Sequence, residues 1–175
     1  MFCKTHRNSR EVHAILTEHL RPEDEKHIAL FSSVTESNRK REILEDFTKE
    51  NSSIRVLLAT SAFGMGINVK GLHHVIGYGC SRDVDDYFQE SGRVGRDGKQ
   101  SHAILFNYKG NFGKGKTDEA MREYVNSTDK CHRELLLKHY EQQSSTLPVK
   151  HLCCDVQGWP DFDMFYSKTI ILKLS

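Results

Sequence analysis

The sequence predicts an α/β fold, in which a parallel sheet is flanked by helices, followed by a small helical subdomain. Short runs rich in leucine and β-branched residues alternate with amphipathic segments of helical period as far as Phe106. Strands that alternate with helices pair in parallel, because each helix returns the chain across one face of the sheet. Of the 175 residues, 37% are apolar, which suffices for one core of ordinary size.

Five strand-like segments support this fold. A strand tail at Met1–Cys3 is followed by runs at residues 28–31, 54–59, 75–78 and 102–106. A first helix is predicted to be capped near Asn8 and Glu11, and its predicted inward side chains are Val12, Ile15, Leu16 and Leu20. A second spans Ser37–Lys49, with Ile43, Leu44 and Phe47 inward and a solvated basic face of Arg39, Lys40 and Arg41.

Two further helices are predicted at Glu119–Val125 and Cys131–His139, the second with Leu135, Leu136 and His139 inward. The formal net charge of +1 is nearly neutral. Any contact with nucleic acid must therefore come from a local groove and not from a globally basic body. No apolar run is long enough to span a membrane, so no membrane partner is expected.

The segment Gln89–Gly98 carries the most specific chemistry. Arg93 and Arg96 stand among three glycines, after a helical turn that presents Val84, Tyr87 and Phe88 behind Asp83. The guanidinium group keeps its charge and offers a planar fork of donors that suits phosphoryl oxygens, and glycine lets the backbone turn tightly beside such a ligand. This pattern is typical of phosphoryl-transfer sites that use an arginine finger.

Gln89–Gly98, together with Val56–Asn68 upstream, closely resembles motifs VI and V of RecQ-type DNA helicases of superfamily 2, and weaker matches extend over Met1–Gln157. The resemblance implies that residues 1–108 form the second RecA-like helicase domain and that 109–157 form a linker and a helical zinc-binding-like subdomain. Residues 158–175 have no counterpart and are left unassigned. Because the first strand is short, we expect the chain to begin part-way through a domain.

The same resemblance implies roles for single residues. Arg96 is the finger on the γ-phosphate, Arg93 makes a supporting phosphate contact or an interdomain pair, and Gln89 senses nucleotide. Gly64, Gly66 and Asn68 approach ATP, although the family usually has Asp at the last position, and Thr60 and Ser61 touch the backbone of one DNA strand. An alternative for the glycines is a plain strand-to-helix turn.

The resemblance further implies ATP and Mg²⁺ as cofactors, held with a first RecA-like domain that is absent from this sequence. We therefore expect the C-terminal portion of an ATP-dependent 3′–5′ DNA helicase, inactive alone, whose partners are DNA, ATP and that first domain. The alternative is a non-catalytic DNA-binding or regulatory module that docks on a full-length helicase. The expected location is the nucleus, or the nucleoid in a prokaryote, with a role in DNA repair or recombination.

Zn²⁺ is a further expected cofactor. Cys131 and Cys154 resemble ligands of the zinc-binding subdomain in RecQ proteins, with His151 at the second ligand position, Cys153 as an alternative ligand and Gln157 at the position of the final cysteine. Thiolates and imidazoles are the ligands that structural zinc requires. The alternative is that the cysteines are small buried hydrophobes. Five cysteines without a secretory leader favour a reducing, intracellular environment.

Gly110–Thr117 satisfies the phosphate-binding pattern G-x-x-x-x-G-K-[ST]. In a working P-loop, Lys116 would neutralise phosphate and Thr117 would hold magnesium. The residues that follow are too few for the additional parallel strands of such a domain. Glycine and lysine also suit a flexible linker, which is the interpretation we prefer.

Overall fold

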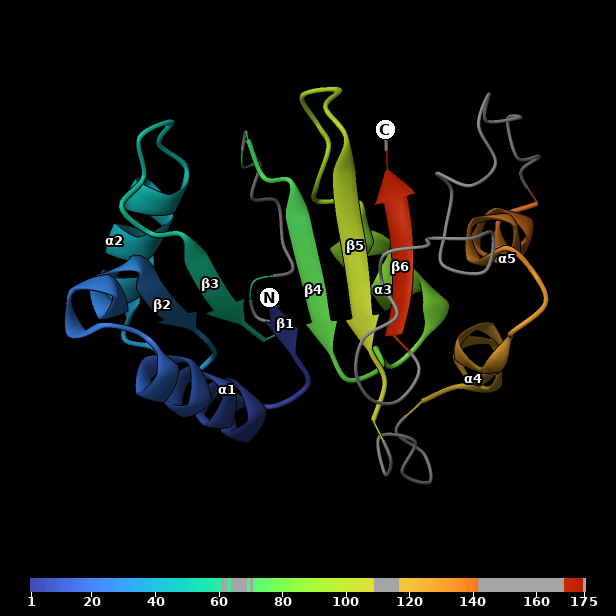
Figure 1. The fold of residues 1–175 in the computed structure, drawn as a ribbon, viewed down its shortest axis with the longest axis horizontal. Helices are drawn as coiled ribbons and strands as arrows, with labels where there is room; N and C mark the ends of the chain where they lie inside the picture. Colours follow the sequence, from blue (N-terminus) through green and yellow to red (C-terminus); the bar gives the residue numbers. More distant parts are fainter. Residues whose placement is uncertain (61–62, 64–68, 70, 109–116, 142–168, 175) are drawn as a thin grey trace. The chain divides into compact units, whose positions relative to one another are not determined.

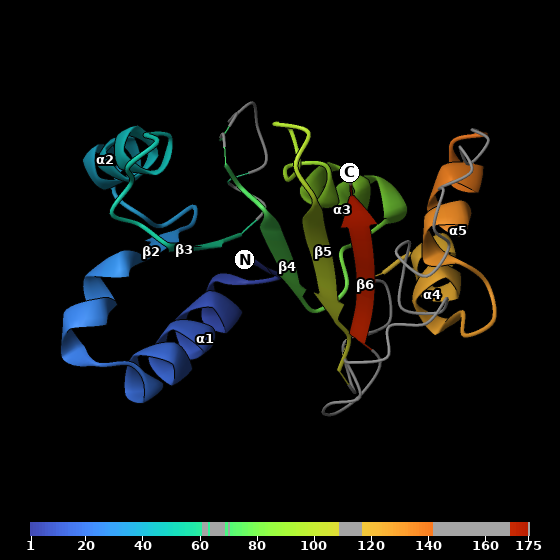
Figure 2. The same ribbon diagram turned by 45° about the horizontal axis from the view of Figure 1, so that its top comes forward.

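The structure is a computed structural model that describes residues 1–60, 63, 69, 71–108, 117–141 and 169–174. The chain divides into two compact units, Met1–Gly71 and Leu72–Ser175. Figures 1 and 2 show helices and strands alternating along each of them. Among the described residues, no helix combines the length and apolar character needed to cross a membrane.

The first unit is built on three parallel strands in the order β2, β3, β1. β2 (Ile28–Phe31) runs in register with β3 (Val56–Ala59), and β1 (Phe2–Cys3) pairs on the other side of β3. Two α-helices, α1 (His6–His19) and α2 (Ser37–Phe47), and the 3₁₀ helix η1 (Pro22–His27) contact these strands. The predicted strands and the second predicted helix are confirmed to within two residues at each end.

The first helix begins earlier than predicted. Its N-cap is Thr5, whose hydroxyl oxygen accepts a hydrogen bond from the Asn8 N–H at 3.1 Å, so the predicted cap at Asn8 and Glu11 is wrong. The predicted inward face is also wrong at two positions, because Ile15 is 54% exposed and Leu20 is 39% exposed. The buried positions of α1 are instead Ser9 and Val12. A serine can face inward here because its hydroxyl donates to the His6 carbonyl oxygen at 2.8 Å.

The second unit contains two parallel strands, β4 (His74–Tyr78) and β5 (Ser101–Phe106), paired from His74↔His102 to Tyr78↔Phe106. β6 (Thr169–Leu174) pairs antiparallel with β5, so part of the unassigned tail completes an edge of this sheet. Helices α3 (Val84–Ser91), α4 (Glu119–Asn126) and α5 (His132–His139) complete the unit. Leu136 is buried as predicted, whereas His139 is exposed because it lies in the last turn of α5.

Candidate functional site

Thr60 lies directly after β3, at the carboxyl end of the strand, where ligands bind in parallel sheets. Its N–H donates to the Phe31 carbonyl oxygen at 3.2 Å, and its own carbonyl oxygen accepts from the Phe63 N–H at 3.0 Å. The Thr60 side chain is buried. The other predicted ligand contacts of this segment, Ser61, Gly64, Gly66 and Asn68, lie outside the described residues.

Phe63 fixes the middle of this segment to the core of the first unit. It is 4% exposed, and its ring centroid lies 5.1 Å from that of Phe31 and 6.3 Å from those of Phe2 and Phe47. Sequence reasoning did not single out this residue. The available signal was one aromatic side chain between the small residues Ala62 and Gly64.

Helix α3 leads directly into residues 92–98, here called the arginine loop. The N-cap of the helix is Asp83, whose carboxylate accepts a hydrogen bond from the Asp86 N–H at 2.8 Å, and the helix buries Val84 and Tyr87. The loop turns at Gly95 and Gly98, which have φ angles of +73° and +74°. Residues that carry a side chain rarely adopt this backbone conformation, so the two glycines define the course of the loop.

The two arginines of the loop have different surroundings. Arg93 is 8% exposed, and burial lowers its pKa, an effect that Arg96 reinforces and Glu90 opposes. Arg96 is exposed, and its Nε donates to the Gly92 carbonyl oxygen at 3.4 Å. Gln89, on the last turn of α3, is also exposed. The geometry therefore presents Gln89 and Arg96 to solvent and keeps Arg93 inside.

Glu90 links the arginine loop to the segment before α3. The Ser81 hydroxyl donates to Glu90 Oε2 at 2.8 Å. Burial raises the pKa of Glu90 to about 7, and Asp86 adds to the increase, whereas the Ser81 hydrogen bond and Arg93 act in the opposite direction. This contact was not predicted from the sequence, because residues nine apart on either side of a helix start give no periodic signal.

The raised pKa of Glu90 predicts a pH-dependent stability of the second unit. Since the folded pKa of about 7 exceeds the ordinary value of 4.5, the folded state favours the protonated carboxyl. Its stabilising contribution is complete below pH 4.5 and is lost as the pH rises through 7. We expect urea unfolding between pH 5.5 and 8 to show a smaller loss of stability in Glu90→Gln than in the wild type. The exposed Glu18→Gln variant is the control, and identical pH profiles for wild type and Glu90→Gln would contradict the prediction.

The start of α4 bears on the P-loop pattern. The N-cap is Asp118, whose carboxylate accepts from the Met121 N–H at 2.7 Å, so the helix begins at Glu119. A P-loop needs its Lys and Thr at the helix start, where the N–H groups face phosphate. Here Thr117 lies before the N-cap residue, and the Asp118 carboxylate occupies the helix start where a P-loop would bind phosphate. This favours a linker, although residues 110–116 lie outside the described part of the chain.

Of the four predicted zinc ligands, the structure describes only Cys131, which is buried at the N-cap of α5. His151, Cys153 and Cys154 lie outside the described residues. The next residue, His132, is buried, and its Nε2 lies 3.1 Å from the Tyr124 carbonyl oxygen. Because a carbonyl oxygen only accepts, Nε2 carries the proton.

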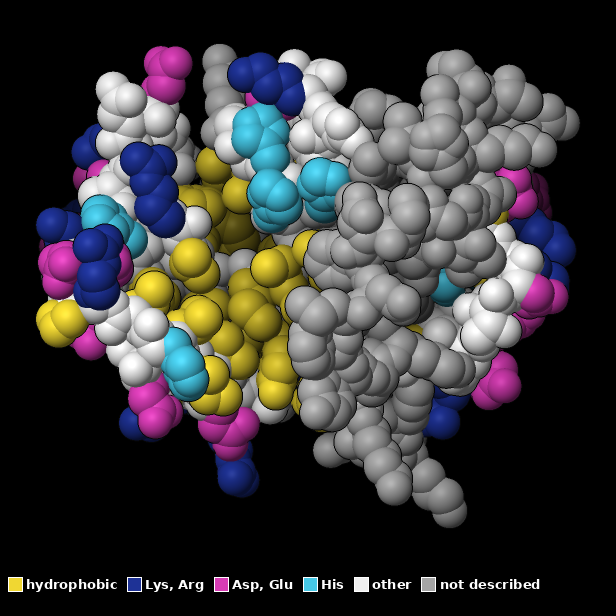
Figure 3. Space-filling view, in the orientation of Figure 1, with side chains coloured by type: hydrophobic (Ala, Val, Ile, Leu, Met, Phe, Trp, Pro, Cys, Tyr) yellow, Lys and Arg dark blue, Asp and Glu magenta, His cyan; other side chains and the backbone are white. Residues whose placement is uncertain are grey.

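On the face of the first unit that Figure 3 shows, the described lysines and arginines lie among Asp and Glu and form no extended basic patch. Three arginines of this unit pair with carboxylates, as in Arg7–Glu11 at 2.8 Å and Arg39–Glu42 at 3.0 Å. Histidines gather on the visible face of the second unit (Figure 3). In the same unit the rings of His74 on β4 and His102 on β5 stack, with their centroids 5.2 Å apart. Within the ranges that the structure describes, no three His, Cys, Asp or Glu side chains converge as metal ligands.

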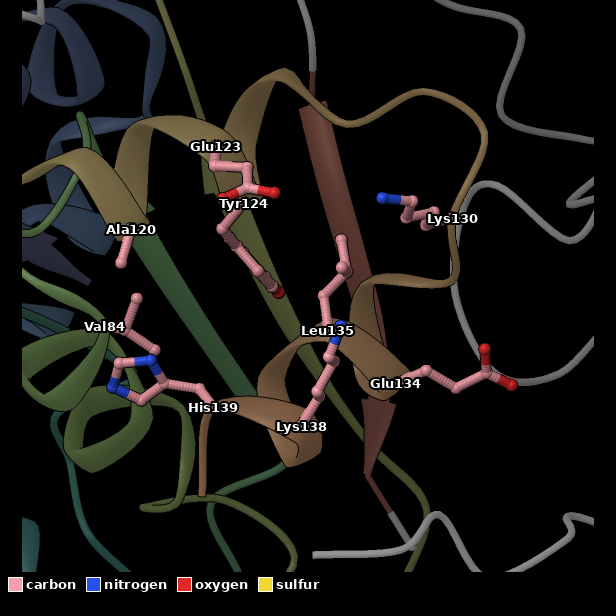
Figure 4. Close-up of a pocket in the computed structure, with 9 residues that line it drawn as sticks. All are labelled: Val84, Ala120, Glu123, Tyr124, Lys130, Glu134, Leu135, Lys138 and His139. Atoms are coloured by element: carbon pink, nitrogen blue, oxygen red, sulfur yellow. The ribbon is translucent and has the colours of Figure 1, made fainter. Parts of the chain in front are cut away.

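A pocket of about 380 Å³ lies between α3, α4 and α5. Figure 4 shows side chains from α4 and α5 around it, with Val84 of α3 at one end. Its apolar lining comes from Val84, Ala120, Tyr124 and Leu135, and Glu123 and Lys138 contribute charges of opposite sign. The three helices are therefore not in continuous contact with one another.

Residues 1–98 match the family model described as the helicase conserved C-terminal domain. ATP-dependent helicase wrn-1 of Caenorhabditis elegans is 32% identical over 136 residues, which cover 67% of this chain and 13% of that protein. ATP-dependent DNA helicase Q1 of Mus musculus is 34% identical over 126 residues, covering 62% of this chain and 19% of that protein.

A putative ATP-dependent RNA helicase, R290 of Acanthamoeba polyphaga mimivirus, is 28% identical over 161 residues, covering 82% of this chain and 28% of that protein. The chain thus spans less than a third of the length of these relatives. A structure of Mss116p bound to ssRNA and AMP-PNP superposes with a TM-score of 0.53 at 23% identity, over 62% of this chain and 20% of that one. This likeness concerns the fold, and it confirms the predicted RecA-like α/β class.

Proposed function

Because the chain belongs to the family of the helicase conserved C-terminal domain and is RecQ-like within it, we propose that it supplies the arginine-finger half of an ATP-dependent 3′–5′ DNA helicase. The observation that carries this proposal is the pair of arginines in the arginine loop. Arg96 is exposed on a loop fixed by two glycines of positive φ, and Arg93 is buried behind it. A guanidinium held in this way stabilises charge that develops on a transferring phosphoryl group.

In the proposed site, ATP and Mg²⁺ are held mainly by a first RecA-like domain, and closure of the two domains brings Arg96 to the γ-phosphate. The exposed Gln89 lies one helical turn before Arg93 and senses the bound nucleotide. Arg93 is too buried to reach a ligand without rearrangement, so it supports the loop or pairs across the domain interface. Gly64, Gly66 and Asn68 complete the nucleotide side of the site.

DNA contact is proposed at Thr60 and Ser61, at the carboxyl end of β3. The Thr60 side chain is buried, so little of its hydroxyl is open to a ligand. Since the described surface of the first unit is mixed in charge, we expect few phosphate contacts and therefore a shallow dependence of DNA affinity on salt concentration.

A titration with a labelled, non-hydrolysable ATP analogue and magnesium tests the proposal and the P-loop alternative together. We expect little binding to the chain alone, and no further loss in Lys116→Ala or Arg96→Ala, because half of a composite site lacks its main phosphate contacts. Binding that is lost in Lys116→Ala would show that Gly110–Thr117 is a nucleotide site in its own right. Joined to a first RecA-like domain, the chain should support DNA-stimulated ATP hydrolysis; DNA binding without hydrolysis would instead favour a non-catalytic module.

We also propose that Cys131, His151, Cys153 and Cys154 hold a structural Zn²⁺. The buried Cys131 thiol at the start of α5 fits this role, because a helix N-terminus favours the thiolate that zinc requires. The other three residues supply one imidazole and two thiols. When bound, the metal would fix the segment after α5 to the start of that helix.

Elemental analysis of the purified chain should find close to one zinc ion per molecule, and Cys131→Ala should lose it. Cys3→Ala is the matched control, because Cys3 is also a buried cysteine. Burial raises the pKa of Cys3 to about 11, which keeps it a protonated thiol and a poor metal ligand. Zinc retained in Cys131→Ala, or absent from the wild type, would contradict this assignment.

A further inference from the structure

The end of α5 is joined to one face of α3 by Tyr140. Its hydroxyl donates to Asp85 Oδ1 at 2.6 Å, and its ring lies 4.7 Å from that of Phe88. Asp85 and Phe88 are three residues apart on α3 and therefore share a face of the helix. Burial and the hydrogen bond to Asp85 both raise the pKa of Tyr140, so its hydroxyl stays protonated and keeps donating at physiological pH.

A second link joins the same helices through their buried faces. The ring of Tyr87 on α3 lies 5.4 Å from that of Tyr124 on α4, and Tyr124 meets the ring of His132 on α5 edge-on at 5.1 Å. All three residues are buried. The aromatic series therefore runs from α3 through α4 to the start of α5.

Between these links the packing is open. The pocket bounded by Val84, Tyr124 and Leu135 separates parts of α3, α4 and α5 (Figure 4). Because the hollow removes direct packing there, the orientation of α3 depends more strongly on the contacts beside it. Tyr140 supplies a hydrogen bond to α3 beside the pocket, and a hydrogen bond fixes direction as well as distance.

We propose that Tyr140 is a positioning residue that ties the α4–α5 pair to α3 and thereby holds the arginine loop in place. Helix α3 ends at Ser91, and the arginine loop begins at the next residue. Gln89 lies on α3 itself and Arg96 lies in the loop that follows it directly, so a shift of α3 displaces both. The consequence for ATP hydrolysis rests on the proposed function of the arginine loop, whereas the mechanical link does not.

Hydrogen exchange on the chain tests the mechanical link. Tyr140→Phe removes the hydrogen bond but keeps the ring on Phe88, so we expect amides of residues 84–98 to exchange about 3 to 10 times faster, as expected for the loss of one net hydrogen bond. Asp85→Asn in the Tyr140→Phe background should add little further change. Tyr78→Phe, which removes a hydroxyl from β4, is the matched control. Unchanged exchange at 84–98, or the same acceleration throughout the chain, would overturn the proposal.

The functional consequence is measured on the chain joined to a first RecA-like domain. Since a finger arginine acts in the transition state, Tyr140→Phe should lower kcat for DNA-stimulated ATP hydrolysis several-fold and leave KM for ATP nearly unchanged. Faster exchange at 84–98 with unchanged kcat would overturn the role of Tyr140 in positioning the loop. A wild-type assembly without ATP hydrolysis would instead contradict the proposed function, and the exchange experiment would still decide the link.

Discussion

Replacing Arg96 with alanine is expected to lower ATP hydrolysis by about three to five orders of magnitude when the chain acts together with a first RecA-like domain. Arg96 is exposed on a loop whose course is set by Gly95 and Gly98, so its guanidinium can reach a ligand held by another domain. The substitution removes charge stabilisation that is needed chiefly in the transition state. We therefore expect the single-turnover rate constant for ATP hydrolysis, measured with excess enzyme, to fall far more than the affinity for ATP.

Two further variants test whether Arg96 acts through its planar fork of donors or through positive charge alone. Arg96→Lys keeps the positive charge but loses the planar fork of donors, so it should remain strongly impaired. Arg39→Ala removes an exposed arginine of α2 that pairs with Glu42, and it should hydrolyse ATP at the wild-type rate. An Arg96→Ala enzyme within tenfold of the wild type would exclude Arg96 as the finger.

The strands could be predicted closely because their local signals agree with their environment. The predicted runs at residues 28–31 and 54–59 are mostly apolar, and the strands β2 and β3, which lie within them, bury most of their side chains. The helices were predicted by the same periodicity, and their errors have physical causes. In α1 the apolar Ile15 is exposed while Ser9 is buried. The serine can be buried because its hydroxyl donates a hydrogen bond to the His6 carbonyl oxygen.

The contacts that shape the candidate site could not be predicted, because they join residues with no common period. Ser81 and Glu90 meet across the start of α3, and Tyr140 reaches Asp85 over 55 positions of sequence. The resemblance of Gln89–Gly98 implied a finger on the γ-phosphate for Arg96 and a supporting phosphate contact or an interdomain pair for Arg93, but the different burial of the two arginines depends on the tertiary fold. The pairing of β6 with β5 is likewise invisible locally, since Thr169–Leu174 is apolar and short enough to fit several roles.

Replacing Phe63 with alanine is expected to destabilise the first unit by about 3 to 5 kcal/mol. The ring is 4% exposed and is surrounded by Phe2, Phe31 and Phe47, so its removal leaves a cavity and ends three aromatic contacts. With a urea m-value of about 2 kcal/mol/M, the unfolding midpoint should fall by roughly 2 M. Val34→Ala is the control, because Val34 is 68% exposed and should change stability by less than about 0.5 kcal/mol.

Phe63→Leu distinguishes volume from ring geometry, since leucine refills most of the space and should recover more than half of the lost stability. The same series addresses function, because Phe63 is the anchored residue between Thr60 and the predicted nucleotide contacts Gly64, Gly66 and Asn68. Thr60 depends on this anchor through its carbonyl oxygen, which accepts the Phe63 N–H. If the segment is positioned by this ring, Phe63→Leu should weaken DNA-stimulated ATP hydrolysis under conditions where the protein remains fully folded. Wild-type activity in folded Phe63→Leu would show that the backbone turn after β3 positions the segment without the aromatic cluster.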